Sequence, residues 1–199
     1  MDLLLWRHAQ AVDVNSTLDD LQRPLTPHGE AQAERMAAWL KRHLPAQTRI
    51  LCSPALRTRQ TVQHLTTKDY EICPHIAPNA SVQDLLQAAQ WPGDNAAAEN
   101  QGVTAETVVD DQAQQALGKI EAEAETEAVA ETAADKKTKN KRAVLIVGHQ
   151  PTLGLVAQQL LQTQTPCAIK KGSLWWLRHR VRNSQPQVVL VAVLNPQML

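Results

Sequence analysis

The sequence predicts an α/β fold, a three-layer α/β/α sandwich, and three observations lead to this class. Predicted strands alternate with predicted helices along most of the chain. The run AVLIV at 143–147 is continuously apolar, which is typical of a central strand buried on both faces of a sheet. Three polar motifs each follow a predicted strand, and ligands of open α/β folds bind beyond the carboxyl ends of the strands.

The expected strands are short apolar runs. The first begins directly at the N-terminus and runs into a loop at Arg7 and His8. The last two are apolar runs close together in sequence, which suggests a closing hairpin. The expected strands lie at 2–6, 49–52, 71–73, 143–147, 174–180 and 188–194.

The expected helices carry start signals and apolar positions at helical spacing. Thr26 can cap the first helix, and Pro27 suits its first position. Ser53-Pro54 is expected to cap and open the second helix. The expected helices cover 26–44, 53–65, 81–90 and 152–161.

The formal charge of the whole chain is zero, from 20 basic and 20 acidic residues. This balance gives no indication of a nucleic-acid or membrane partner. The apolar run in MDLLLWRH is too short for a signal peptide or a membrane span. Three scattered cysteines lack metal-ligand spacing and are expected to be reduced thiols. We therefore expect a cytoplasmic protein.

Segment 93–142 interrupts this single domain, which otherwise spans 1–199. It is poor in aromatic residues, rich in Ala and Glu, and carries a net charge of −5, whereas the remainder carries +5. Such a composition buries too little apolar area to offset the entropy of ordering. We expect 93–142 to be a disordered acidic insertion, which costs its host domain little because loop-closure entropy grows slowly with length.

The three motifs at strand ends supply the groups that phosphoryl transfer needs. His8 can attack phosphorus, because neutral imidazole is available near pH 7 and also leaves easily. Arg7 and Arg57 can clamp the phosphoryl oxygens, and His149 adds a further donor. Each of these residues alone is more often structural or solvated, but their common placement at strand ends favours a site. Arg59 is two positions beyond Arg57 and should face elsewhere on the helix.

A metal site is the alternative use of His8 and His149. No cysteine or carboxylate near either histidine has the spacing of a zinc ligand set. We therefore expect neither a metal nor any other cofactor.

Four motifs, in this order, resemble the histidine phosphatase superfamily: LLLWRHAQA, RPLTPHG, SPALRTRQT and VGHQPTLG. Within it they are similar to the short phosphohistidine phosphatases of the SixA type. The resemblance covers the chain outside the acidic insertion and implies a phosphoglycerate mutase-like fold. It also implies that His8 is phosphorylated during turnover, with Arg7, Arg57 and His149 around the phosphate. Arg23 corresponds to a position that borders the pocket.

Two departures from the family pattern bear on the substrate. The usual Arg-His-Gly has Ala9 in place of glycine, which should be tolerated in an ordinary backbone region. Members that hydrolyse phosphate monoesters usually carry a carboxylic acid after the third strand, but 76–82 reads IAPNASV. An alkoxide leaving group needs a proton, whereas imidazole, with an ordinary pKa of about 6.5, can leave without strong acid assistance. The lack of an acid therefore favours phosphohistidine.

These observations predict a metal-independent phosphohistidine phosphatase that acts on a phosphohistidine-bearing protein, such as a phosphorelay or phosphotransfer domain in signal transduction. We expect a monomer. One alternative is a phosphatase of small phosphate monoesters that draws its acid from Asp84 or the insertion. Another is a non-catalytic phosphate-binding module, although binding alone would not need both histidines.

Overall fold

The computed structural model describes residues 1–13, 19–92 and 142–199 of the chain. Within these residues six strands form one sheet in the order β3-β2-β4-β1-β5-β6. β1 to β4 are parallel where they pair, β5 runs antiparallel to β1, and β6 closes a hairpin with β5. The strands are β1 Asp2–Arg7, β2 Arg49–Cys52, β3 Glu71–Ile72, β4 Ala143–Gly148, β5 Leu174–Arg182 and β6 Gln185–Leu194.

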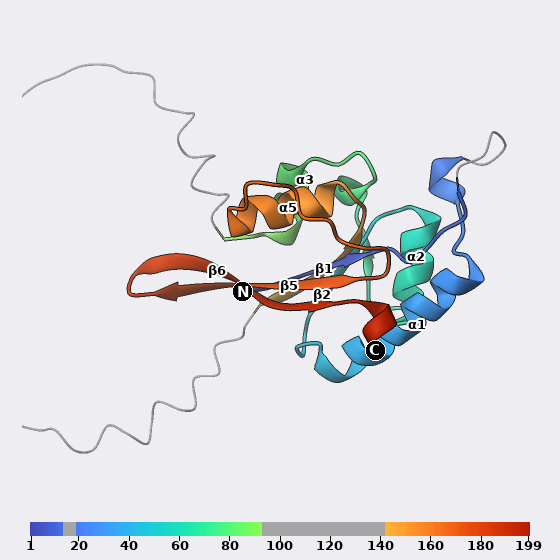
Figure 1. Cartoon of the computed structure of the whole chain (residues 1–199), viewed down its shortest axis with the longest axis horizontal. Helices are drawn as coiled ribbons and strands as arrows, with labels where there is room; N and C mark the ends of the chain where they lie inside the picture. Colours follow the sequence, from blue (N-terminus) through green and yellow to red (C-terminus); the bar gives the residue numbers. More distant parts are fainter. Residues whose placement is uncertain (14–18, 93–141) are drawn as a thin grey trace, which may run out of the picture.

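Helices cover both faces of the sheet, so the predicted three-layer sandwich is confirmed (Figure 1). The pair α1 and α2 packs on one face, and the pair α3 and α5 packs on the other. The α-helices are α1 Pro27–His43, α2 Leu56–Gln63, α3 Val82–Ala89 and α5 Thr152–Leu161. Short 3₁₀ turns occur at η1 Asp20–Gln22, η2 Pro74–Ile76 and η4 Pro196–Met198.

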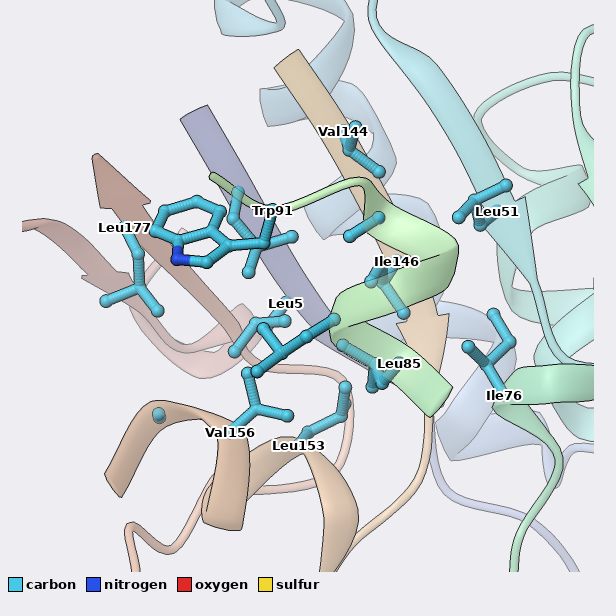
Figure 2. Close-up of a cluster of buried hydrophobic side chains, with 14 of the residues drawn as sticks. Leu5, Leu51, Ile76, Leu85, Trp91, Val144, Ile146, Leu153, Val156 and Leu177 are labelled. Carbon is cyan, nitrogen blue, oxygen red and sulfur yellow. The ribbon is translucent and has the colours of Figure 1, made fainter. Parts of the chain in front are cut away.

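Alternation of side chains along β1 divides the core into two apolar clusters. Leu3 and Leu5 face the cluster under α3 and α5, which Figure 2 shows with Trp91 at its edge. Leu4 and Trp6 face the cluster under α1. All four of these β1 side chains are fully buried, and complete burial of one large apolar side chain contributes about 1.5–3 kcal/mol. This packing fixes β1 in the middle of the sheet, and His8 follows directly from its carboxyl end.

Most predicted elements are confirmed, including the start of α1, where the Thr26 hydroxyl accepts from the Gly29 backbone N–H at 3.0 Å. The start of α2 differs, because this helix begins at Leu56 and not at Ser53. Ser53 instead extends the β2–β4 pairing through its N–H, which donates to the Val147 carbonyl at 3.1 Å. Its hydroxyl is hydrogen-bonded to His149.

The predicted insertion, 93–142, lies outside the described residues except for Arg142. The Arg142 carbonyl accepts from the Asp2 backbone N–H at 2.8 Å, at the amino end of β1. None of the helices in the described ranges has the length and apolar character needed to cross a membrane.

Candidate active site

The carboxyl ends of β1 and β4 bring the two predicted histidines together. Arg7 is paired with Gly148 in the parallel register, so His8 and His149 leave neighbouring strands at the same level. The His8 backbone N–H donates to the Gly148 carbonyl at 3.1 Å. The two imidazole rings are buried, and their centroids lie 5.3 Å apart.

The hydrogen bond of His8 defines which ring nitrogen is free to react. Nδ1 lies 2.7 Å from the Ala9 carbonyl oxygen, and a carbonyl can only accept, so Nδ1 carries the proton. The Nε2 lone pair is therefore exposed for attack. Burial lowers the pKa of His8 to about 3, only partly opposed by the Ala9 hydrogen bond and reinforced by repulsion from Arg57 and Arg7. His8 is thus a neutral nucleophile at pH 7.

His149 is hydrogen-bonded to Ser53, the residue that follows β2. Its Nε2 lies 2.7 Å from the Ser53 hydroxyl, while its buried Nδ1 has no hydrogen-bond partner among the described residues. Burial, followed by the influence of His8 and Arg57, lowers the pKa of His149 to about 3. A neutral imidazole with an unused nitrogen can donate a hydrogen bond to a bound anion.

Arg7 and Arg57 supply positive charge close to the histidines, with Arg57 buried and Arg7 half-buried. Arg7 Nη1 donates to the Ile169 carbonyl at 2.7 Å. Arg57, in the first turn of α2, is only 3% exposed and is hydrogen-bonded to Asp20. The Nε atoms of both arginines are buried without a partner in the described ranges. Burial lowers the pKa of each guanidinium from its ordinary value, but both remain charged at neutral pH.

Arg23 reaches this group only through a carboxylate. Its Nη2 lies 2.7 Å from Asp20 Oδ1, and Asp20 Oδ2 lies 2.9 Å from Arg57 Nη2. Arg23 also donates from Nη1 to the Val12 carbonyl at 2.9 Å. Arg23 is therefore linked to Arg57 through Asp20, and this link is consistent with its predicted position at the border of the site.

The arrangement is suited to a tetrahedral dianion. A neutral nucleophilic nitrogen lies close to two guanidinium groups, and Arg7 Nε, Arg57 Nε and His149 Nδ1 are buried without a partner among the described residues. Leaving a buried polar group unpaired costs roughly 1–3 kcal/mol. A bound phosphoryl group would remove this cost, because its oxygens accept charge-assisted hydrogen bonds.

Three contributors to the site were not predicted from sequence. The sequence predicts Ser53 as a helix cap, Asp20 lies in a stretch without periodicity, and no role is predicted for the loop 169–173. This loop lies over His8, because the Gly172 N–H donates to the His8 carbonyl at 3.0 Å and the Ser173 carbonyl accepts from the Arg7 N–H at 3.0 Å. The charge of Lys171, in this loop, is one of the influences that lower the pKa of His8.

No group of three or more His, Cys, Asp or Glu side chains in the described residues is arranged to hold a metal ion.

Comparison with known families gives a match over most of the chain. The family described as histidine phosphatase superfamily (branch 1) matches residues 3–189. An uncharacterized protein of Mycobacterium tuberculosis is 41% identical over 58 residues, which are 29% of this chain and 36% of that protein. The match therefore spans about a third of the length of this curated relative.

Solved structures of the same fold include enzymes with different substrates. The protein histidine phosphatase SixA complexed with tungstate matches with a TM-score of 0.61 and 20% identity, covering 100% of this chain and 99% of that one. A mycobacterial glucosyl-3-phosphoglycerate phosphatase matches with a TM-score of 0.51 and 15% identity, covering 96% and 97%. At these identities the likeness establishes the phosphoglycerate mutase-like fold. It does not identify the substrate, which has to be inferred from the residues of the site.

Proposed function

The chain belongs to the histidine phosphatase superfamily, and on that premise we propose that it is a protein phosphohistidine phosphatase that works through a phosphohistidine intermediate on His8. Superfamily membership accounts for phosphatase chemistry with a histidine nucleophile. The choice of substrate depends on the acid–base groups around His8.

The reaction has two displacements at phosphorus. His8 Nε2 attacks the phosphoryl group of the substrate, the new N–P bond forms, and the bond to the leaving imidazole breaks. Arg7, Arg57 and His149 bind the phosphoryl oxygens while charge shifts between the entering and leaving nitrogens. Water then attacks phosphorus, the His8 N–P bond breaks, and inorganic phosphate and neutral His8 are released.

The observation that carries the substrate choice is the state of the carboxylates. Among the described residues, Asp20 is the one carboxylate that hydrogen-bonds to or influences the pKa of these site residues. Its own pKa is lowered because the hydrogen bonds from Arg57 and Arg23 outweigh the raising effect of burial. Asp20 is therefore ionised at neutral pH and has no proton to give to a leaving group.

Asp84, the other candidate acid, is committed to a helix terminus. Its Oδ2 accepts from the Ser81 N–H at 3.0 Å, and its own backbone N–H donates to the Ser81 hydroxyl at 3.1 Å, which together form the capping box of α3. The Ser81 hydroxyl also donates to Asp84 Oδ2 at 2.7 Å. These hydrogen bonds lower the pKa of Asp84. Without a protonated carboxyl, an alkoxide leaves poorly, whereas imidazole leaves as a neutral molecule when its ring carries a proton on the other nitrogen.

The test compares kcat/KM on a phosphohistidine peptide and a phosphoserine peptide of the same sequence. We expect the phosphohistidine peptide to be hydrolysed at least about a hundredfold more efficiently, the range that general acid catalysis supplies. His8→Asn serves as the control and should abolish both activities. Equal turnover of both peptides would instead support a monoester phosphatase, and binding without turnover would support a phosphate-binding module.

A further inference from the structure

Asp20 joins two arginines of the site through three of its own atoms. Oδ2 accepts from Arg57 Nη2 at 2.9 Å, and the Asp20 backbone carbonyl accepts from Arg57 Nη1 at 2.5 Å. Oδ1 lies 2.7 Å from Arg23 Nη2 and accepts from Arg23 Nε at 2.9 Å. One residue thus holds both terminal nitrogens of Arg57 and binds Arg23 at the same time.

These contacts determine how Arg57 is oriented. A guanidinium group is planar, and its five N–H bonds form a rigid fork. Fixing Nη1 and Nη2 therefore fixes the plane of the group and the direction of the Nε–H bond. Nε is the nitrogen of Arg57 that is buried and has no partner among the described residues.

We propose, on the basis of the proposed function, that Asp20 is a positioning residue that aligns Arg57 and Arg23 to bind the phosphoryl oxygens. Asp20 acts through the arginines and does not touch the phosphoryl group. Holding a charged side chain in its binding orientation before the ligand arrives removes the entropic cost of ordering it during binding.

The opposite role for Asp20 would be that of a competitor that occupies Arg57 in place of phosphate. Two observations argue against this competing role. The backbone carbonyl of Asp20 cannot leave Arg57 Nη1 without movement of η1, and the Asp20 contacts leave Arg57 Nε unused. The two roles predict effects of opposite sign, because removal of a competitor tightens anion binding and removal of a positioning residue weakens it.

Titration calorimetry with tungstate, a tetrahedral oxyanion, measures this effect without turnover. We expect Asp20→Ala to raise the Kd for tungstate on the order of tenfold, equivalent to about 1.4 kcal/mol. Asp20→Asn should restore much of the affinity, because its amide oxygen still accepts from an arginine. Asp19→Asn is the matched control: it removes a neighbouring charge and keeps the side-chain oxygen that caps η1 by accepting from the Leu21 N–H at 3.4 Å. It should bind tungstate like the wild type.

A double-mutant cycle with Arg57→Ala tests whether Asp20 acts through that arginine. In this background the effect of Asp20→Ala should shrink to about twofold, the remainder passing through Arg23. A full tenfold effect there, or unchanged or tighter tungstate binding by Asp20→Ala alone, would overturn the proposal.

Hydrolysis of the phosphohistidine peptide by the wild type, measured in parallel, separates the two proposals. Absent hydrolysis together with a cycle of the expected form overturns the proposed function and supports the positioning role. Normal hydrolysis of the peptide, together with tungstate binding that Asp20→Ala leaves unchanged, would support the proposed function and overturn the positioning role.

Discussion

The two ends of β1 bury charge in opposite ways. At the amino end, both carboxylate oxygens of Asp2 accept from Arg178, from Nε and from Nη2, each at 2.7 Å. At the carboxyl end, Arg7 and Arg57 each retain a buried Nε without a partner among the described residues. One strand of six residues therefore carries a completed ion pair at one end and an incomplete set of donors at the other.

This difference separates a structural role from a binding role. A buried carboxylate with two charge-assisted hydrogen bonds has little left to offer a ligand. Buried donors without partners cost free energy in the folded protein, and an anion that accepts from them recovers it. We therefore expect changes at the amino end to affect stability and changes at the carboxyl end to affect activity.

The largest effect is expected at His8. His8→Ala should retain the fold and lose activity by several orders of magnitude, as is typical when a nucleophile is removed. Trapping with labelled substrate followed by mass spectrometry locates the phosphorylated residue. A label on His149 would contradict the assignment, because His149 Nε2 is the nitrogen that contacts Ser53.

Arg57→Ala should reduce kcat/KM by roughly 10- to 100-fold, since hydrogen bonds to a charged group contribute about 1.5–3 kcal/mol. Arg57→Lys should also be impaired, because lysine keeps the charge but loses the fork that both Asp20 and the phosphoryl group use. Arg59→Ala is the control from the same helix: its Nε is also buried without a partner among the described residues, but it lies two positions further along the helix and should change kcat/KM by less than about threefold. A larger loss from Arg59→Ala would show that the other face of α2 lines the site.

Arg178→Ala tests the amino end. It leaves Asp2, which is 2% exposed, without its ion-pair partner. Removing one member of a buried pair costs about 3–5 kcal/mol, and partial exposure of Arg178 reduces this to about 2 kcal/mol of unfolding free energy. Chemical denaturation measures the loss, and kcat/KM below the transition should match the wild type. A variant with wild-type stability and low activity would contradict the assignment of a structural role to the amino end of β1.

The sequence predicted the regular parts of this fold because their signals are local. The bounds of β2 and α5 agree with the predicted ranges, and the Thr26 cap was visible from residues 26–29. The Asp20–Arg57 contact joins residues 37 positions apart, and no periodicity or motif marks Asp20. Ser53 has the composition of a helix cap, and only tertiary pairing with His149 changes its role. Contacts of this kind depend on the packed fold and are not visible in a single sequence.

The pH dependence of stability sharpens the comparison further. The pKa values of His8 and His149 are about 3 in the folded protein, below the ordinary value of 6.5. Between these limits the unfolded chain binds more protons, so stability is present above pH 6.5 and is lost as pH falls. Between pH 6.5 and pH 5 the unfolding free energy of His8→Asn should therefore fall by about 1.5 kcal/mol less than that of the wild type.

Val181→Ala is the control for this experiment. Its side chain is exposed and does not titrate, so its loss of unfolding free energy between pH 6.5 and pH 5 should equal that of the wild type. Thermal or denaturant unfolding at several pH values gives both slopes. If the unfolding free energy of His8→Asn depended on pH as steeply as that of the wild type, burial would not be holding His8 neutral.

The smallest effect is expected from the acidic segment. It carries the net charge of −5 that offsets a basic remainder of +5, and the chain re-enters the sheet through Arg142 at the amino end of β1. The six residues of β1 extend about 20 Å, at 3.3 Å per residue, from this point to the site. The Debye length is about 8 Å at physiological ionic strength and about 30 Å at 0.01 M. The segment should therefore weaken the attraction of an anionic substrate only in dilute salt.

Replacing 94–141 with a short Gly/Ser linker tests this expectation. kcat/KM should rise by about twofold at 0.01 M ionic strength and stay unchanged at 0.15 M, because salt screens the charges over the longer distance. A linker of the same length with neutral residues controls for chain length. A rise that persists at high salt would mean that the segment contacts the site directly, and equal rates at every ionic strength would reduce it to a spacer.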